Sequence, residues 1–594
     1  MLYNYHIVKT NMENEILQPI QQYKSEFKEK HRQLTEEYFD KLVEESGVDV
    51  GENALLMDDR SKTLHKLQAA DKAVQKKKSL RAFLIFCVVV LFLAALITAL
   101  VFYGNTDGLF FLAILLPIVA VGGAIALIVV ICKVLNKKIK QGNGVVVELN
   151  NKVSKIENQA WSQMLPLNLK YGWNIPDQLI YQTVPQIQLD KYFDEDKHDF
   201  FKYSHGLDVS GRQDVSVCCA RSGNSCGNPF LLIRYFNREI VQHTYTGSLT
   251  VSWTEHYTDS EGKSHTRTET ETLFASVVRP KPEYYYITRL YYGNDAAPDL
   301  AFSRNPVVPK NSTEKQIASL VKKGEKKLEK KSREAVKSGK SFNMLANSEF
   351  EVLFGAADRN HETQFRMMFT PLAQQNMVEL LKNNEPYGDD FSFDKRGKVN
   401  VIYSAHSANL DIDANPSQFA SFDLAGARES FVKFNMQYFA SLYFDFAPLF
   451  SIPIYQQERP EKPFGECTEH SNIGDFEMES VVNYFNKSFF APDGAVTQQI
   501  LKAVPVSVDE QGTLSQVTSY AYRGIDRVDY VSVMARNGRS YSVPVPWVEY
   551  IPVQKTSQVY LQAVDLTREQ YLTTDNEASD TTILVGGVKA RFIG

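Results

Sequence analysis

Two apolar segments separated by a short polar turn constrain this chain more than any other feature of its sequence. The segment from Ala82 to Tyr103 holds 22 residues without a charged side chain, and the segment from Leu109 to Cys132 holds 24. At a helical rise of 1.5 Å per residue each is about 33–36 Å long, which exceeds the roughly 30 Å hydrocarbon core of a bilayer. We therefore predict a transmembrane hairpin over residues 81–133, with spans at 82–103 and 109–132.

The charges beside the hairpin predict its orientation. The connecting turn contains no Lys or Arg, whereas both outer flanks are basic. The positive-inside rule then places both termini in the cytoplasm and makes this a multi-pass protein of the cell membrane. Neither span carries an ionisable group of the kind that ion pathways use, so we interpret the hairpin as an anchor whose partner is the lipid bilayer. The flanking basic residues are Lys72, Lys76, Lys77, Lys78 and Arg81 before the hairpin, and Lys133, Lys137, Lys138 and Lys140 after it.

Residues 12–80 form a predicted amphipathic helical arm. Apolar or aromatic side chains recur every three or four residues from Ile16 to Leu42, with Glu and Lys between them. We expect this stripe to pack onto the protein's own soluble domain, with a homo-oligomeric coiled coil as the alternative. The helix should break between Ser46 and Gly51, and a second helix should lead into the membrane. Whether Met1 or Met12 is the true start stays open.

Residues 145–450 are predicted to form a cytosolic α+β domain, which begins with a helix to about Met164 and an extended stretch through Pro166, Pro176 and Pro185. Its β-rich subdomain, residues 200–300, shows the period-2 alternation of half-buried strands, and the turn at Asp259–Gly262 predicts a hairpin. A further strand is expected at Tyr284–Tyr292. These short strands should make one antiparallel sheet.

The pentapeptide Gly223-Asn-Ser225-Cys-Gly227 matches the spelling of a hydrolase nucleophile elbow. An elbow needs a helix directly after the serine, whereas here Asn228-Pro229 leads into a strand-like run. We therefore predict a glycine-containing turn between two antiparallel strands, and no partnership of Ser225 with a histidine.

The cysteines do not follow the spacing of a structural metal site. Cys218 and Cys219 are adjacent, so on a strand they would point to opposite faces, and Cys226 and Cys467 complete the soluble set. We assign no metal ligand, no cofactor and no catalytic residue.

A basic helix is predicted at residues 311–340, where Asn311 and Glu314 have capping-box spacing. One interpretation is a solvated helix laced by ion pairs, and another is contact with anionic lipid headgroups. Nucleic acid is disfavoured because no aromatic residues are interleaved with the lysines, and because the net charge of the whole chain is −5. The candidate contacts with an anionic surface are Lys322, Lys323, Lys326, Lys327, Lys330 and Lys331.

The next segment carries a resemblance to a known family. A predicted strand at Phe350–Phe354 precedes a helix capped by Thr370 and ending near Asn383, and a hairpin follows over Phe391–Tyr403. This order, about residues 340–450 together with the N-terminal membrane hairpin, resembles the bacterial membrane protein family called domain of unknown function 3137. That family has no assigned activity, so the resemblance implies a location and no catalytic residues.

The remaining chain completes the fold class. The aromatic stripe of residues 427–450 is interpreted as a core helix, and a proline-rich linker separates it from a smaller C-terminal β-rich module at 465–594. In that module Asn537-Gly538 predicts a hairpin, and an acidic stretch covers residues 575–580. The prediction is thus an α+β protein with a two-helix transmembrane hairpin and N-terminal amphipathic helices.

These features favour a non-enzymatic function. We expect a membrane-anchored cytosolic binding or scaffold protein with an unknown ligand and protein partner, and the resemblance implies a bacterial origin. One alternative is a membrane-tethered enzyme, such as a hydrolase, with an unrecognised site. Another is a scaffold that self-assembles through the N-terminal helix.

Overall fold

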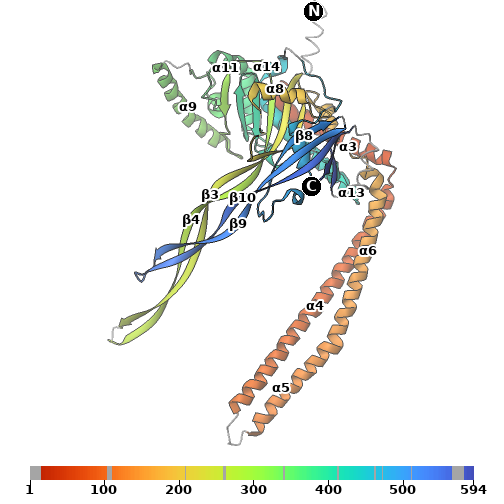
Figure 1. The fold of residues 1–594 in the computed structure, drawn as a ribbon, viewed down its shortest axis with the longest axis vertical. Coiled ribbons are helices and arrows are strands. Elements are labelled where there is room, and N and C mark those ends of the chain that lie inside the picture. Colours follow the sequence, from red (N-terminus) through yellow and green to blue (C-terminus); the bar gives the residue numbers. More distant parts are fainter. Residues whose placement is uncertain are drawn as a thin grey trace, which may run out of the picture. The chain divides into compact units, whose positions relative to one another are not determined.

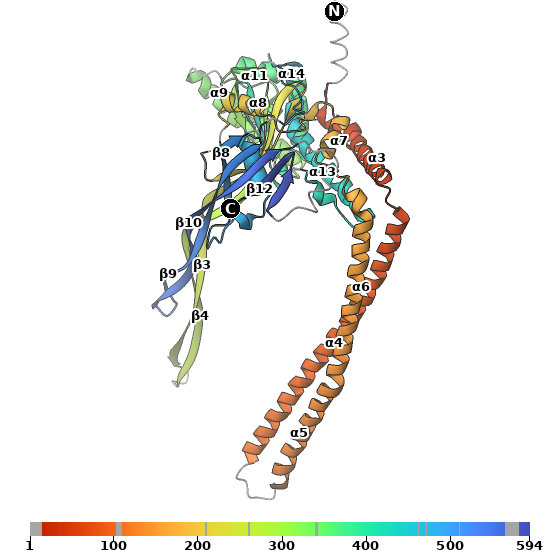
Figure 2. The ribbon, with the colours of Figure 1, turned by 45° about the vertical axis from the view of Figure 1, so that its right-hand side comes forward.

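The protein combines α-helices with antiparallel sheets, and its chain divides into two compact units (Figures 1 and 2). Unit 1 comprises Met1–Glu37, Gly172–Pro416 and Val432–Gly594, and unit 2 comprises Tyr38–Tyr171 and Ser417–Phe431. The computed structural model describes residues 15–102, 110–207, 209, 211–258, 262–338, 342–410, 412, 414–460, 463–470, 472–509, 511–564 and 581–594. The predicted turn at 105–107 and the acidic stretch at 575–580 lie outside these residues, as do Met1 and Met12.

Unit 2 is built from very long antiparallel helices. Helix α4 (Val50–Phe102) packs along α5 (Phe110–Val130) and α6 (Asn136–Asn168), and a π-helical turn, Ile131–Leu135, joins the last two. The predicted break before α4 is confirmed, because α3 (Lys28–Ser46) ends at Gly47, whose φ of 67° favours glycine. The predicted extended stretch at Pro166 is wrong. This proline lies inside α6, close enough to its end that little of the helix follows it.

The first part of α4 pairs with α6 as a polar stalk. Residues 50–81 precede the apolar stretch and extend about 48 Å at the helical rise. Val74 is buried against Gly142, where a Cβ would lie 2.6 Å from a valine methyl group, so the two helices approach closely. The Arg60 guanidinium donates to Glu157 at 2.8 Å across the same pair.

A seven-stranded antiparallel sheet forms the centre of unit 1. Its order is β1-β2-β3-β4-β7-β6-β5. The expected set of short strands between residues 214 and 292 is instead dominated by two long ones, which pair in one uninterrupted register. The strands are β1 (Ile187–Leu189), β2 (Val215–Ser225), β3 (Asn228–Thr258), β4 (Ser264–Gly293), β5 (Ala301–Arg304), β6 (Phe391–Arg396) and β7 (Val399–Ser404).

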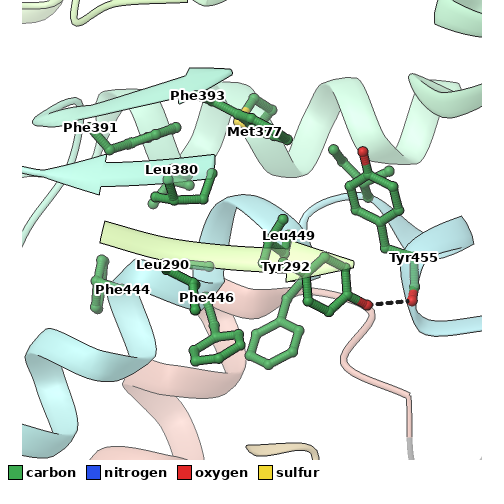
Figure 3. Close-up of a cluster of buried hydrophobic side chains, with 14 of the residues drawn as sticks. Leu290, Tyr292, Met377, Leu380, Phe391, Phe393, Phe444, Phe446, Leu449 and Tyr455 are labelled. Atoms are coloured by element: carbon green, nitrogen blue, oxygen red, sulfur yellow. Dashed lines mark hydrogen bonds between the residues drawn. The ribbon is translucent and has the colours of Figure 1, made fainter. Parts of the chain in front are cut away.

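Helices pack around this sheet and enclose the main apolar core (Figure 3). The aromatic helix α13 supplies buried rings to it, as predicted, and the Tyr292 hydroxyl donates to the main-chain oxygen of Tyr455 at 3.0 Å. The helices of unit 1 after β1 are α8 (Glu195–His205), α9 (Glu314–Lys337), α10 (Ser348–Phe354), α11 (Glu362–Met368), α12 (Pro371–Lys382), α13 (Leu424–Phe450, shared with unit 2), α14 (Pro453–Gln457) and α15 (Asp475–Val482); α7 (Ile175–Thr183) precedes β1.

The predicted strand at Phe350–Phe354 is wrong, because these residues form helix α10. Phe350, Leu353 and Phe354 recur at the helical spacing and are buried, Asn347 accepts from the Phe350 amide at the helix start, and Gly355 ends the helix. The next two predictions are confirmed. Thr370 caps α12, and β6 and β7 form the expected hairpin.

The first part of the N-terminal apolar stripe packs onto the protein's own chain, which was the preferred prediction, with a coiled coil as the alternative. Ile16, Ile20, Tyr23 and Phe27 are buried in the main core, within or beside α2 (Pro19–Gln22) and the π-helical turn Tyr23–Phe27. The Tyr23 ring contacts aromatic rings of α13 at centroid distances of 5.0–5.9 Å. This part of the stripe is therefore covered by its own chain.

The C-terminal residues build a second antiparallel sheet. Its order is β11-β12-β10-β9-β8, and the predicted Asn537-Gly538 hairpin joins β9 to β10. Both sheets belong to unit 1, and the predicted division between residues 145–450 and 465–594 stays a prediction. The strands are β8 (Ile500–Asp509), β9 (Gly512–Met534), β10 (Ser540–Ala563), β11 (Thr582–Val585) and β12 (Val588–Phe592).

The outer halves of two hairpins pack against each other and form what we call the β-arm, which comprises residues 238–258, 264–284, 523–534 and 540–552. Val251 and Leu273 of the first hairpin share a small apolar cluster with Ala535 and Val543 of the second. The two ribbons run side by side in both views (Figures 1 and 2). An isolated two-stranded ribbon is only marginally stable, so this face-to-face packing stabilises both hairpins.

Candidate functional site

The most extensive unusual surface in unit 2 is the apolar part of its helices. Two helices are long and apolar enough to cross a membrane, and within the protein only 11% of the most apolar stretch of the first and 17% of the second is buried. Phe83, Phe86 and Val119 are each at least 60% exposed. Contiguous exposed apolar surface of this size is characteristic of a membrane or interaction site.

Helix α9 carries the lysines that the sequence singled out. Its inner side is fixed to unit 1 by the buried Ile317 and by Gly324, where a Cβ would meet Val352 at 2.3 Å. The helix begins later than predicted: Thr313 and Gln316, rather than Asn311 and Glu314, form the reciprocal cap. The structure describes this helix only to Lys337.

The six candidate lysines of α9 are all exposed, but they are not equivalent. Lys331 donates to the main-chain oxygen of Ala357 and lies over the Phe342 ring, so it is partly occupied by the fold. Lys330 is within 3.9 Å of Glu334 on the next turn. The other four project from the helix as a compact basic face, which we call the lysine face: Lys322, Lys323, Lys326 and Lys327.

Ser225 lies in a hairpin turn, as predicted. It ends β2, and Cys226 and Gly227 form the two-residue connection to β3 with φ values of 50° and 79°. Gly223 has a different role, because a Cβ there would lie 2.3 Å from the Gln188 oxygen. Within the described residues Ser225 makes no hydrogen bond to an imidazole, so this serine has no histidine positioned to activate it.

The four cysteines outside the long apolar helices, Cys218, Cys219, Cys226 and Cys467, do not form a cluster. Cys218 lies beside an irregularity in the pairing of β2 with β3. Burial raises the pKa of Cys226 and of Cys467 to about 11, which makes both poor nucleophiles and poor metal ligands at neutral pH. In the described part of the chain no group of three or more His, Cys, Asp or Glu side chains could hold a metal ion.

One small pocket in unit 1 gathers several charged groups. Its volume is about 70 Å³, whereas small-molecule sites usually measure about 300–1,000 Å³. The space suits a few ordered waters better than a substrate. Its polar lining consists of Asn174, Asp190, Lys191, Tyr192, Arg221, Ser222, Glu477, Ser480 and Tyr484.

Three charged residues that line this pocket are paired: Asp190 with Lys197, Arg221 with Asp177, and Glu477 with His470. Asp190 accepts from Lys197 at 2.7 Å and from Ser222 at 2.6 Å, and the Ser222 hydroxyl also accepts the Asp194 amide. Burial raises the pKa of Asp190, although the bonds from Lys197 and Ser222 oppose the rise. Lys197 is completely buried and also lies 3.3 Å from Asp194, so we assign it a structural role.

A histidine near the pocket is also engaged. The Nε2 atom of His470 lies 2.9 Å from Glu477, and its ring stacks on Tyr192. Burial opposes protonation of His470, but the hydrogen bond and charge of Glu477 outweigh burial and raise its pKa. Sequence reasoning missed these pairs, and no spacing signal identifies partners such as Asp190 and Ser222, which lie 32 positions apart in the chain.

Three features of the described residues are therefore candidates for a functional site: the exposed apolar parts of the long helices, the lysine face and the small pocket. Comparisons with protein-family models, with curated proteins and with solved structures find no match for this chain.

Proposed function

We propose that the protein is a membrane-anchored binding or scaffold protein, with the apolar parts of α4 and α5 inserted in the bilayer and both termini in the cytoplasm. The observation that carries this proposal is the low burial of the apolar stretches, 11% and 17%. In water such surface is unfavourable by about 25 cal/mol per Å², and a bilayer removes that cost. The stalk formed by α4 and α6 then separates the membrane from the rest of unit 2.

The basic flanks support the orientation. Lysines precede the apolar stretch of α4 and follow that of α5, and the sequence between the two helices has none. Cytoplasmic flanks of membrane helices are enriched in Lys and Arg, so this distribution supports a cytoplasmic position for both flanks.

Cysteine labelling of intact cells tests both insertion and orientation. A membrane-impermeant maleimide should label Thr106→Cys and should miss Gln75→Cys, a matched control at an exposed position on the stalk, as well as native Cys467. Opening the cells with detergent should make Gln75→Cys reactive. Labelling of Gln75→Cys but not Thr106→Cys in intact cells would reverse the orientation. Release of the protein from membranes by alkaline carbonate would refute insertion.

We further propose that the lysine face binds anionic lipid headgroups. Its four lysines lie on two successive turns of a helix whose other side is packed, so they form one rigid cationic surface. Each lysine near an anionic membrane contributes about 1 kcal/mol, and salt weakens the attraction.

Lysine footprinting of the full-length protein in liposomes tests this contact. In vesicles containing phosphatidylserine, acylation of Lys322, Lys323, Lys326 and Lys327 should fall relative to pure phosphatidylcholine vesicles, and high salt should abolish the difference. Lys589, exposed on β12, is the internal control and should react equally in both. Equal acylation of the lysine face in both lipids at low salt would identify it as an ordinary solvated surface.

A further inference from the structure

One edge of the β-arm is left open over an unusual length. Strand β3 pairs with β2 only as far as Asn237, so beyond that residue only β4 pairs with it. Residues 240–254 of this edge contain no Asp, Glu, Lys, Arg or Pro. At about 3.3 Å per residue this uncharged edge is roughly 50 Å long.

The prolines of β4 show which backbone groups the open edge presents. Pro280 pairs with Gln242 and Pro282 with Ile240. Proline has no N–H to donate, so these are non-hydrogen-bonded pairs, and the alternation of an antiparallel ladder makes every even–even pair of this ribbon the same kind. The hydroxyls of the paired Thr250 and Thr272 lie 3.1 Å apart, which agrees with the closer side-chain approach of a non-hydrogen-bonded pair. Hence the N–H and C=O groups of the even-numbered residues from 240 to 254 point outward from β3.

The other three edges of the β-arm carry the features that natural proteins use to prevent strand addition. Charges and prolines blunt an exposed edge, because an added strand would have to desolvate the charge or lose a hydrogen bond. On β4 these are Arg267, Glu269, Glu271, Arg279, Pro280, Lys281, Pro282 and Glu283; on β9 they are Asp526, Arg527 and Asp529; on β10 they are Pro544, Pro546, Glu549 and Pro552.

We propose that the open edge of β3 pairs with β3 of a second copy of this chain, in antiparallel orientation about a two-fold axis. The proposal stands apart from membrane anchoring, because it rests on unit 1 alone. An unguarded edge of this length is an aggregation hazard unless something covers it, and the same edge of a second copy matches it in length and in lack of charge.

The side chains of the edge are self-complementary. In an antiparallel pair with aligned faces, even-numbered residues meet even-numbered ones, so the Thr and Ser side chains of one outer face continue the same row on the partner. The odd-numbered residues, which include Tyr245, Leu249 and Trp253, face the second hairpin, and pairing extends that apolar layer. Glu239 and Glu255 lie just outside the uncharged stretch and limit the overlap to it.

The decisive experiment substitutes each residue of one cross-strand pair separately, one on the open strand β3 and one on β4. Thr246 and Ser276 are paired, and each directs its N–H away from the ribbon, so Thr246→Pro and Ser276→Pro remove equivalent donors from opposite edges while sparing the β3–β4 hydrogen bonds. The mass of the full-length chain in detergent is measured by light scattering over a concentration series. Wild type and Ser276→Pro should be dimers, and Thr246→Pro should associate at least about tenfold more weakly.

Three results would overturn the proposal: a wild type that stays monomeric across the series, dimers of equal affinity in both proline variants, or a monomer that carries a different protein on this edge. If thermal unfolding shows that Thr246→Pro disrupts unit 1, a second pair of variants decides the matter. Thr250→Lys places a charge on the open strand and should abolish the dimer, whereas Thr272→Lys, its cross-strand partner on the same face, should keep it. Equal dimerisation of these two would refute β3 pairing.

Discussion

Lys395 should make the stability of unit 1 rise with pH above neutrality. Its side chain on β6 is completely buried, and its Nζ donates to the main-chain oxygens of Ala296 and Gly397 at 3.0 and 2.6 Å. Among the described residues Lys395 forms no ion pair with a carboxylate, and burial is the cause of its altered pKa. Burial therefore lowers the pKa of Lys395 from 10.5 to about 7.

The sign of the effect follows from proton binding. Between pH 7 and 10.5 the unfolded chain keeps a proton on Lys395 that the folded protein has largely released, so the free energy of unfolding increases with pH. From pH 7 to 8.5 the gain from this one group is about 1.5 kcal/mol, which for a unit of this size raises Tm by roughly 2 °C. This window ends below the range in which buried cysteines and tyrosines begin to titrate.

Lys395→Met isolates this contribution. The substitution keeps an unbranched side chain of similar length but removes the titrating group, so the Tm of the wild type should rise relative to the variant between pH 7 and 8.5. Scanning fluorimetry of the full-length protein in detergent measures both at matched ionic strength. If the difference in Tm between wild type and Lys395→Met is constant over this range, the reasoning from unpaired burial is refuted.

The same assay tests three further predictions. Lys502→Met should lower the free energy of unfolding by about 3 kcal/mol at pH 8, because the buried Glu479, which lies 2.8 Å from Lys502, would lose its countercharge. A smaller loss of stability than for Lys395→Met would contradict this. Burial lowers the pKa of His31 to about 4, so between pH 7.5 and 5 the unfolded chain binds a proton on His31 that the folded protein does not. The free energy of unfolding of the wild type should therefore fall by about 2 kcal/mol over this range, and His31→Gln should lack that part of the fall. Gly223→Ala should cost about 1–3 kcal/mol, because its Cβ would overlap the Phe230 ring and the main chain; an unchanged Tm would refute the close packing.

Features written in local sequence were predictable. The two apolar segments, the Thr370 cap of α12 and the Asn537-Gly538 hairpin each depend on residues within a few positions of one another. Helical rise, capping geometry and turn conformation are properties of a short stretch of backbone, so no tertiary information is needed to recognise them. The N-terminal stripe was recognisable for the same reason, because its period belongs to one helix.

Errors arose where a short pattern fits two structures. The apolar run at Phe350–Phe354 suits a strand or a buried helix, and its packing beside α12 and the core stabilises the helix. Strand β3 reads as several short strands, because its alternation varies along its length. It is continuous because β4 pairs with it along its whole length.

The candidate sites themselves were decided by tertiary structure. Asp190 and Ser222 meet across 32 positions of sequence, Glu479 pairs with Lys502, and Lys395 forms no ion pair with any carboxylate in the described part of the chain. The sequence alone indicated two helices long and apolar enough to cross a membrane, and strands whose polar and apolar residues alternate. Both features depend only on residues that are neighbours in the chain. The sequence did not establish which charges are paired or which strand edge is open, because burial and pairing depend on segments that meet only when the chain has folded.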